Sequence, residues 1–166
     1  RFQLVAAMNP CPCGWAGDPR GRCRCTPDMI DRYRGRVSGP LLDRIDIQVE
    51  VARLPPEELR PDAAPGEPSA AVRARVYAAR MRQQARAGVP NARLDQRATD
   101  AHCRLAGPDQ VLLERAIEQL HLSARAMHRI LRVARTVADL AGSEAIATAH
   151  LTEALAYRSR EAIGAR

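Results

Sequence analysis

Residues 123–142, with the sequence SARAMHRILRVARTVADLAG, decide the fold of the second half of the chain. Their apolar side chains recur at the three- and four-residue spacing of an α-helix, and serine and glycine are typical of a helix cap and a helix end. The face expected to point inward consists of Met127, Ile130, Leu131, Ala134, Val137, Ala138 and Ala141. The stretch therefore predicts a long helix with one buried side.

Three further helices are expected around this one. The first runs from a cap at Ser69 to about residue 87, the second begins at Pro108, and the last covers residues 148–158. Amphipathic helices of this length bury their apolar stripes against one another. Residues 69–166 are therefore predicted to form a helical bundle.

The first half of the chain has a different pattern. Residues 2–7 are typical of a short buried strand, and residues 45–51 alternate between apolar and polar as a half-exposed strand does. Between them, residues 10–28 form a loop rich in Cys, Gly, Pro and Arg, and residues 55–68 contain five prolines, which predicts a linker and a domain boundary. The fold class predicted is mainly α-helical with a small β part in residues 1–54.

Composition excludes several classes of function. The chain has 166 residues and 26 basic side chains against 19 acidic ones, and every basic residue is arginine. Without lysine there is no Schiff-base amine and no P-loop lysine. No apolar run approaches the roughly 20 residues of a membrane span, and no secretory signal is visible, so we expect a cytoplasmic protein with no membrane partner. Because the two strands lack partners and the first residue is not Met, we expect a piece of something longer.

Two close cysteine pairs, Cys11/Cys13 and Cys23/Cys25, indicate a metal site in the loop. Four thiolates can surround one tetrahedral Zn²⁺, and metal binding can supply the folding free energy that so polar a loop lacks. Disulfides would require an oxidising compartment, and iron–sulfur clusters normally use other cysteine spacings. Structural zinc is the interpretation we favour, since four thiolates leave no open coordination position for catalysis. The remaining thiol, Cys103, is expected to be a packed residue.

Five segments carry a family resemblance: AMNPCPCG at 7–14, SGPLLDRID at 38–46, LSAR at 122–125, RVARTVADL at 132–140 and HLTEALAYR at 150–158. Through them the chain resembles the magnesium-chelatase-like AAA+ ATPases, and within that group the ComM/YifB branch, over nearly its whole length. The resemblance implies that residues 1–54 are the C-terminal end of an AAA+ α/β module and residues 69–166 its helical lid. The four-cysteine loop is also a feature of this branch.

The resemblance further implies a role for each of three residues. Asn9 matches sensor 1, Arg44 in the Leu-Leu-Asp-Arg segment matches the arginine finger, and Arg125 matches sensor 2 of the lid. The implied cofactors are ATP and Mg²⁺, the implied assembly is a homo-hexameric ring, and the implied partner is DNA, on which a ComM-type competence protein promotes branch migration.

Each of the three residues also has a local interpretation. Asn9 is a good turn residue before a proline, Arg44 lies between two aspartates that could pair with it, and Arg125 could be a solvated surface side chain. Arg125, however, would lie in the first turn of its helix, where the macrodipole disfavours a cation by about 0.3–1 kcal/mol. An anion bound there, such as a nucleotide phosphate, would explain it. A planar guanidinium at Arg44 suits a transferring phosphoryl group.

Two AAA+ motifs have no counterpart. A lysine-free chain cannot contain the Walker A sequence G-x-x-x-x-G-K-[ST], and no acidic run follows an apolar strand as in a Walker B motif. We therefore predict that the chain alone neither binds ATP tightly nor hydrolyses it, although the full-length protein is expected to be an ATPase.

Three functional hypotheses remain open on the sequence. The first is a DNA-translocating motor fragment, the second a chelatase-type protein remodeller, and the third a stand-alone zinc and helical binding module without ATPase activity. The cysteine loop favours the first over the second. The densest basic segment, which is either a DNA-contacting surface or a solvated face, carries Arg73, Arg75, Arg80, Arg82 and Arg86.

Overall fold

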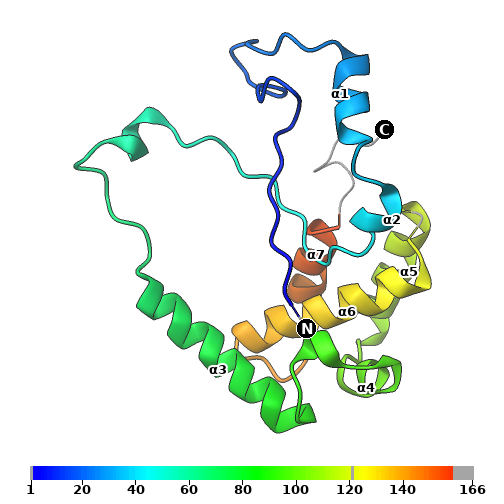
Figure 1. Cartoon of the computed structure of the whole chain (residues 1–166). Helices are drawn as coiled ribbons and strands as arrows, with labels where there is room; N and C mark the ends of the chain where they lie inside the picture. Colours follow the sequence, from blue (N-terminus) through cyan, green and yellow to red (C-terminus); the bar gives the residue numbers. More distant parts are fainter. Residues whose placement is uncertain (1, 121, 159–166) are drawn as a thin grey trace. The chain divides into compact units, whose positions relative to one another are not determined.

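The computed structural model describes residues 2–120 and 122–158 (Figure 1). The chain divides into two compact units, the first ending at Ile45 and the second beginning at Asp46. The first contains the cysteine loop and two helices, α1 (Pro27–Arg34) and α2 (Gly39–Leu42). Thr26 caps α1 by accepting a hydrogen bond from the backbone N–H of Met29.

The predicted β part is wrong. Residues 2–7 and 45–51 are irregular, and the residues that the structure describes contain no strand or sheet. A strand is held by ladder hydrogen bonds to a neighbouring strand, and the described chain offers none to either segment. The apolar side chains are left in solvent, with Phe2 91 %, Val5 85 % and Val51 86 % exposed.

The second unit is helical. It contains α3 (Ser69–Ala87), α4 (Gln96–His102), α5 (Gly107–Gln119), α6 (Ala124–Leu140) and α7 (Thr148–Ala156), with short 3-10 turns at η1 (Pro56–Leu59) and η2 (Asn91–Arg93). Helix α6 packs against α3, α4, η2 and α7, and α5 packs against α7 (Figure 1). The helices expected around residues 69–87, 108, 123–142 and 148–158 are thereby confirmed, whereas α4, which Asp95 caps, was not expected.

The core of this unit is aliphatic and centred on α6. On that helix Ile130, Leu131, Ala134 and Ala138 are buried as predicted, while Ala141 is exposed because α6 ends at Leu140. The other buried members come from the helices and turns around it: Leu94, Cys103, Leu113, Ile146, Leu151 and Ala154. Cys103 is thus the packed thiol that was expected, and burial raises its pKa to about 11.

A buried polar network, which the apolar pattern did not indicate, fastens α3 and η2 to α6. Asp139 is only 1 % exposed, and its carboxylate accepts hydrogen bonds from both terminal nitrogens of Arg86 at 2.7 Å. The guanidinium of Arg135 lies 3.2 Å from the same carboxylate. The side-chain amide of Asn91 donates to Asp139 at 2.8 Å and to Thr136 at 3.0 Å. Burial alone would raise the pKa of Asp139, but the hydrogen bonds from Arg86 and Asn91 and the charge of Arg135 outweigh it and lower that pKa.

Replacing Asp139 with alanine should strongly destabilise the helical unit. The change leaves the guanidinium groups of Arg86 and Arg135 without their carboxylate, and breaking a buried ion pair typically costs about 3–5 kcal/mol. Because the folded pKa of Asp139 is lowered, the stability that this carboxylate contributes is present above its unfolded pKa of about 3.9 and is lost as the pH falls through its folded pKa.

Thermal unfolding followed by circular dichroism at neutral pH tests the predicted loss of stability, with Asp100→Ala as the matched control. Asp100 is 59 % exposed and lies 3.6 Å from His128, so its loss should change stability little. Equal melting temperatures for the two variants would contradict the assignment.

Candidate functional site

Tight turns fold the cysteine loop back on itself. The backbone N–H of Gly14 donates to the carbonyl of Cys11, and that of Gly21 donates to the carbonyl of Asp18, both at 3.0 Å. Gly14 and Gly21 adopt φ values of 77° and 65°, a left-handed conformation that glycine enters without the usual Cβ penalty. The glycines therefore allow the two cysteine pairs to face one another.

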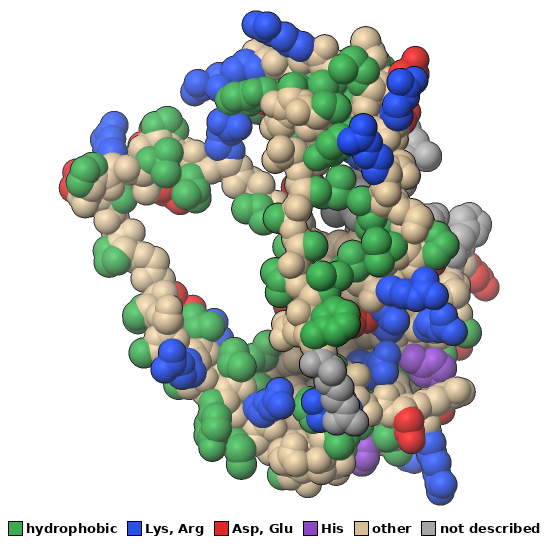
Figure 2. Space-filling model, viewed as in Figure 1, with side chains coloured by type: hydrophobic (Ala, Val, Ile, Leu, Met, Phe, Trp, Pro, Cys, Tyr) green, Lys and Arg blue, Asp and Glu red, His purple; other side chains and the backbone are tan. Residues whose placement is uncertain are grey.

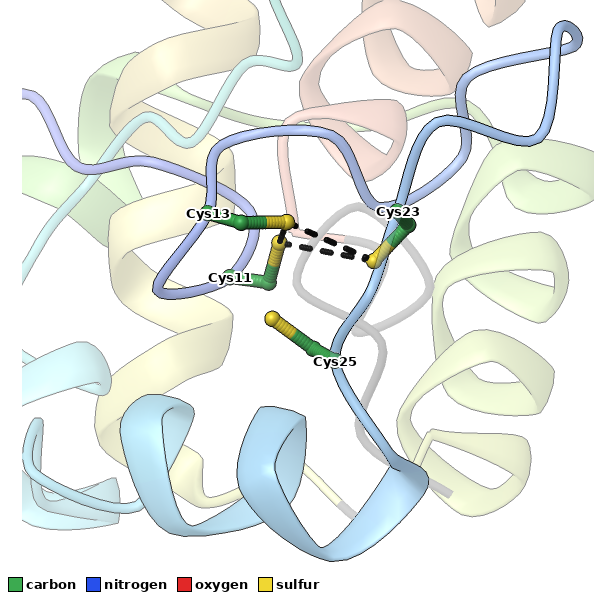
Figure 3. Close-up of side chains that lie close together, drawn as sticks. All are labelled: Cys11, Cys13, Cys23 and Cys25. Carbon is green, nitrogen blue, oxygen red and sulfur yellow. Dashed lines mark hydrogen bonds between the residues drawn. The ribbon is translucent and has the colours of Figure 1, made fainter.

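The four cysteine side chains converge on one point (Figure 3). All of their sulfur atoms lie within 4.8 Å of one another. The sulfur of Cys11 is 3.4 Å from that of Cys13 and 3.8 Å from that of Cys23, and the last two are 3.7 Å apart. Tetrahedral zinc with Zn–S bonds of about 2.3 Å places its sulfurs about 3.8 Å apart. All four thiols are free, and the cluster could hold a metal ion of this kind.

The electrostatics of the cluster differ from thiol to thiol. The backbone N–H of Arg24 lowers the pKa of Cys13 to about 6. The backbone N–H of Cys13 likewise acts to lower the pKa of Cys25, but desolvation and the neighbouring thiols outweigh this effect and raise the pKa of Cys25 to about 12. The backbone N–H of Ala16 also donates to the sulfur of Cys11 at 3.3 Å. Four close sulfurs therefore resist simultaneous ionisation unless a cation balances their charge.

Contacts of two arginine side chains stabilise the folded cysteine loop. The guanidinium of Arg22 lies over the ring of Trp15, 3.6 Å from its centroid, and donates to both carboxylate oxygens of Asp18 at 2.8 Å. Arg34 of α1 donates to the carbonyl of Pro10 at 3.1 Å, next to the first cysteine. The stacking of Arg22 on Trp15 was missed by the sequence reasoning because it depends on the fold of the loop.

Asn9 and Arg44, two of the predicted nucleotide-contacting residues, are exposed and belong to the first unit. The side chain of Asn9 lies over the first turn of the cysteine loop, where a Cβ added to Gly14 would be 3.9 Å from its amide. Arg44 donates to the carbonyl of Pro40 at 2.7 Å, at the start of α2.

Arg125, the third of these residues, belongs to the second unit and is exposed in the first turn of α6. Ser123 caps this helix by accepting from the backbone N–H of Ala126 at 3.2 Å, as predicted. No hydrogen bond or ion pair of the Arg125 side chain is found within residues 2–120 and 122–158. The unfavourable position of this cation at the positive end of the helix therefore has no local compensation in that part of the chain.

The basic helix α3 uses several of its arginines for packing. Arg86 is held in the buried network, Arg82 donates to the carbonyl of Asp139, and Arg75 forms a bidentate pair with Glu67 at 2.7 and 3.1 Å. Arg73 and Arg80 are exposed, lie seven positions apart and so share one face of the helix. Figure 2 shows basic and apolar side chains intermingled on the visible surface of α3.

One further ion pair was missed by the sequence reasoning. Asp46, just after the Leu-Leu-Asp-Arg segment, accepts from Arg129 of α6 at 3.1 Å. Arg129 lies one helical turn after Arg125, and this spacing was the only signal in the sequence that could have drawn attention to Arg129.

Among the described helices, none is both long and apolar enough to span a membrane.

Comparison with known protein families identifies the class of protein to which the cysteine loop and the helical unit belong. Residues 66–158 match the family model for the C-terminal part of magnesium chelatase subunit ChlI, and residues 1–59 match the model for magnesium chelatase subunit ChlI. The chain belongs to this magnesium-chelatase-like family, in its ComM/YifB branch, which confirms the resemblance.

The individual relatives are longer than this chain. It is 47 % identical to competence protein ComM of Haemophilus influenzae over 96 % of its own length and 31 % of that protein. The same identity and coverage hold for YifB of Escherichia coli, and Rv2897c of Mycobacterium tuberculosis is 38 % identical over 95 % of this chain. The chain thus spans about a third of the length of the curated relatives it matches.

Proposed function

We propose that this chain is part of a ComM-type AAA+ ATPase whose ATP hydrolysis drives DNA remodelling and branch migration. Family membership points to ATP and Mg²⁺ as cofactors, and 47 % identity to a competence protein over 96 % of the chain is the observation that carries the proposal. The protein would act in the cytoplasm as a homo-hexameric ring. In that ring Asn9 would position the attacking water, Arg44 would reach the neighbouring subunit's ATP, and Arg125 would contact nucleotide phosphate from the lid.

Chemistry supports these roles. Phosphoryl transfer is accelerated mainly by positioning and by cationic groups that meet the charge developing on the γ-phosphate. Arg44 and Arg125 are exposed, and Arg125 lies where backbone N–H groups and the helix dipole already favour an anion. Each guanidinium remains charged at physiological pH and can bind phosphate through two parallel hydrogen bonds.

The cysteine cluster would hold a structural Zn²⁺ through Cys11, Cys13, Cys23 and Cys25. Three of the sulfur separations support this, since at 3.4, 3.7 and 3.8 Å they lie close to the value of about 3.8 Å expected around a tetrahedral zinc ion. When bound, the ion would stabilise the loop. All four ligand positions would be protein thiolates, so the loop would serve as a folded platform and would not activate water.

A hybrid protein tests the ATPase proposal. In it, this chain replaces the matching 31 % of Haemophilus influenzae ComM. We expect the hybrid to hydrolyse ATP at a rate near that of ComM and the isolated chain to show no turnover. A hybrid that folds and assembles like ComM without ATPase activity would contradict the proposal and favour a stand-alone binding module. Stimulation by a porphyrin-binding protein partner in place of DNA would favour a chelatase-type remodeller.

Arg73 and Arg80 should contact DNA phosphates if α3 faces the nucleic acid. Replacing both with alanine should weaken binding of the 166-residue chain to a duplex oligonucleotide. The slope of log affinity against log salt should fall by about 2, because each phosphate contact contributes about 0.9. Arg75→Ala is the matched control, since Glu67 already occupies that guanidinium. Fluorescence anisotropy across a salt series measures both quantities, and an unchanged slope in the double variant would exclude this face.

A further inference from the structure

The chain immediately after Arg44 is tied to the helical unit at two points. The carboxylate of Asp46 accepts from Nη1 of Arg129 at 3.1 Å and lies 3.7 Å from Nη2 of Arg158. Two residues later, the backbone N–H of Gln48 donates to the carbonyl of Tyr157 at 3.1 Å, at the end of α7. Both contacts lie within the second unit, and together they anchor its first residues to α6 and to the end of α7.

The anchor is more than a solvated surface pair. The side chains of Arg129 and Arg158 are only 17 % and 4 % exposed, whereas Asp46 is 55 % exposed. Both guanidinium groups are therefore largely shielded from water where the carboxylate meets them. A partly buried ion pair is screened less by solvent and salt than an exposed one, which makes such a contact stronger than an exposed pair.

The anchor lies close in sequence to two residues to which the proposed function gives separate roles. Arg129 lies one turn after Arg125 on α6, and Asp46 lies two residues after Arg44, a separation that extended backbone spans in at most about 7 Å. We infer that Asp46 is a positioning residue, which couples the finger segment to the lid helix of its own subunit through Arg129. This inference rests on the proposed function.

A mechanical consequence follows for the reaction. Any movement of α6 on nucleotide binding at Arg125 would carry residues 46–48 with the helix through the ion pair, and it would reach Arg44 through the two peptide units that separate Arg44 from Asp46. A finger acts on the transition state rather than on bound ATP, so loss of the coupling should lower kcat and leave KM for ATP nearly unchanged.

Hydrogen exchange of the 166-residue chain tests the anchor itself. In Asp46→Ala the amide of Gln48 should exchange about fivefold faster than in the wild type, because its hydrogen bond to Tyr157 loses the neighbouring support. Glu50→Ala is the matched control. It removes an exposed carboxylate from the same segment, and no hydrogen bond or ion pair of Glu50 occurs among the described residues. Equal exchange in the wild type and Asp46→Ala would overturn the inference.

Kinetics of the ComM hybrid test the coupling. Asp46→Ala and Arg129→Gln should each lower kcat about tenfold with KM for ATP unchanged within about twofold, and the double variant should be no slower than either single one. Additive losses, or an unchanged kcat in a hybrid whose activity does depend on Arg44, would overturn this inference alone. A hybrid whose activity is insensitive to Arg44 would instead overturn the proposed function.

Discussion

Replacing Cys11 with serine is expected to weaken zinc binding about a hundredfold and to destabilise the loop over residues 10–25. Cys11 is fully buried, its sulfur lies 3.4 and 3.8 Å from those of Cys13 and Cys23, and it accepts a hydrogen bond from the backbone N–H of Ala16. Structural zinc sites supply about 10–16 kcal/mol, so loss of one thiolate in four should cost about 3 kcal/mol, or roughly a hundredfold in affinity. A loop with so little apolar contact has no comparable source of stability.

Metal content and loop protection should change together. The wild-type chain purified under reducing conditions should contain one zinc ion per chain, and chelation should expose residues 10–25 to hydrogen exchange while α6 stays protected. Since zinc binds thiolates, its affinity should rise with pH. The matched control is Cys103→Ala, which removes a thiol from the core of the other unit and should leave zinc content unchanged. An unchanged zinc affinity in Cys11→Ser, or no zinc in the wild type, would eliminate the four-thiolate site.

Replacing Arg44 with alanine should lower the ATPase rate of the ComM hybrid by about 10³-fold or more, the range known for arginine fingers. The guanidinium would meet charge that develops on the γ-phosphate only in the transition state, so KM for ATP should change little. Alanine at this exposed position removes the hydrogen bond to the carbonyl of Pro40 but leaves the buried core untouched, so the fold should persist.

Two comparisons make the Arg44 result specific. Arg36→Ala removes another exposed arginine of the same unit and should leave turnover near the wild-type rate. If the finger acts on the neighbouring subunit, Arg44→Ala subunits should regain activity when mixed with subunits whose own ATP site is blocked, because each supplies what the other lacks. Equal rates for Arg44→Ala and Arg36→Ala would remove Arg44 from the catalytic machinery.

Much of the helical unit could be predicted, because helix signals are local. Spacing alone indicated α3, α5, α6 and α7, and Ser123 caps α6 as expected. Helix α4 was missed because seven residues carry too little periodicity to stand out. The strands were predicted wrongly because alternation of apolar and polar residues reports only a tendency, whereas a strand exists only when another strand pairs with it.

One candidate site could be predicted from the sequence, and the other could not. The spacing of the four cysteines sufficed to predict that their side chains would meet, since the intervening glycines allow the tight turns that bring the two pairs together. By contrast, the run of arginines on α3 could not be sorted from the sequence. Arg86 forms hydrogen bonds to Asp139 and Asn91, although Asp139 is 53 residues away along the chain, whereas Arg73 remains exposed to solvent.

By itself the sequence determined the family, the arginine-only positive charge, the cysteine cluster and the main helices, all of which depend on residue identity and short spacings. Only the tertiary structure decided which charged groups form ion pairs and hydrogen bonds between helices and which remain exposed to solvent. Asp139 closes a network across α3, η2 and α6, and Asp46 meets Arg129 from 83 residues away. The physical reason is that an ion pair depends on the distance between two groups in space, and that distance is set by how the helices pack.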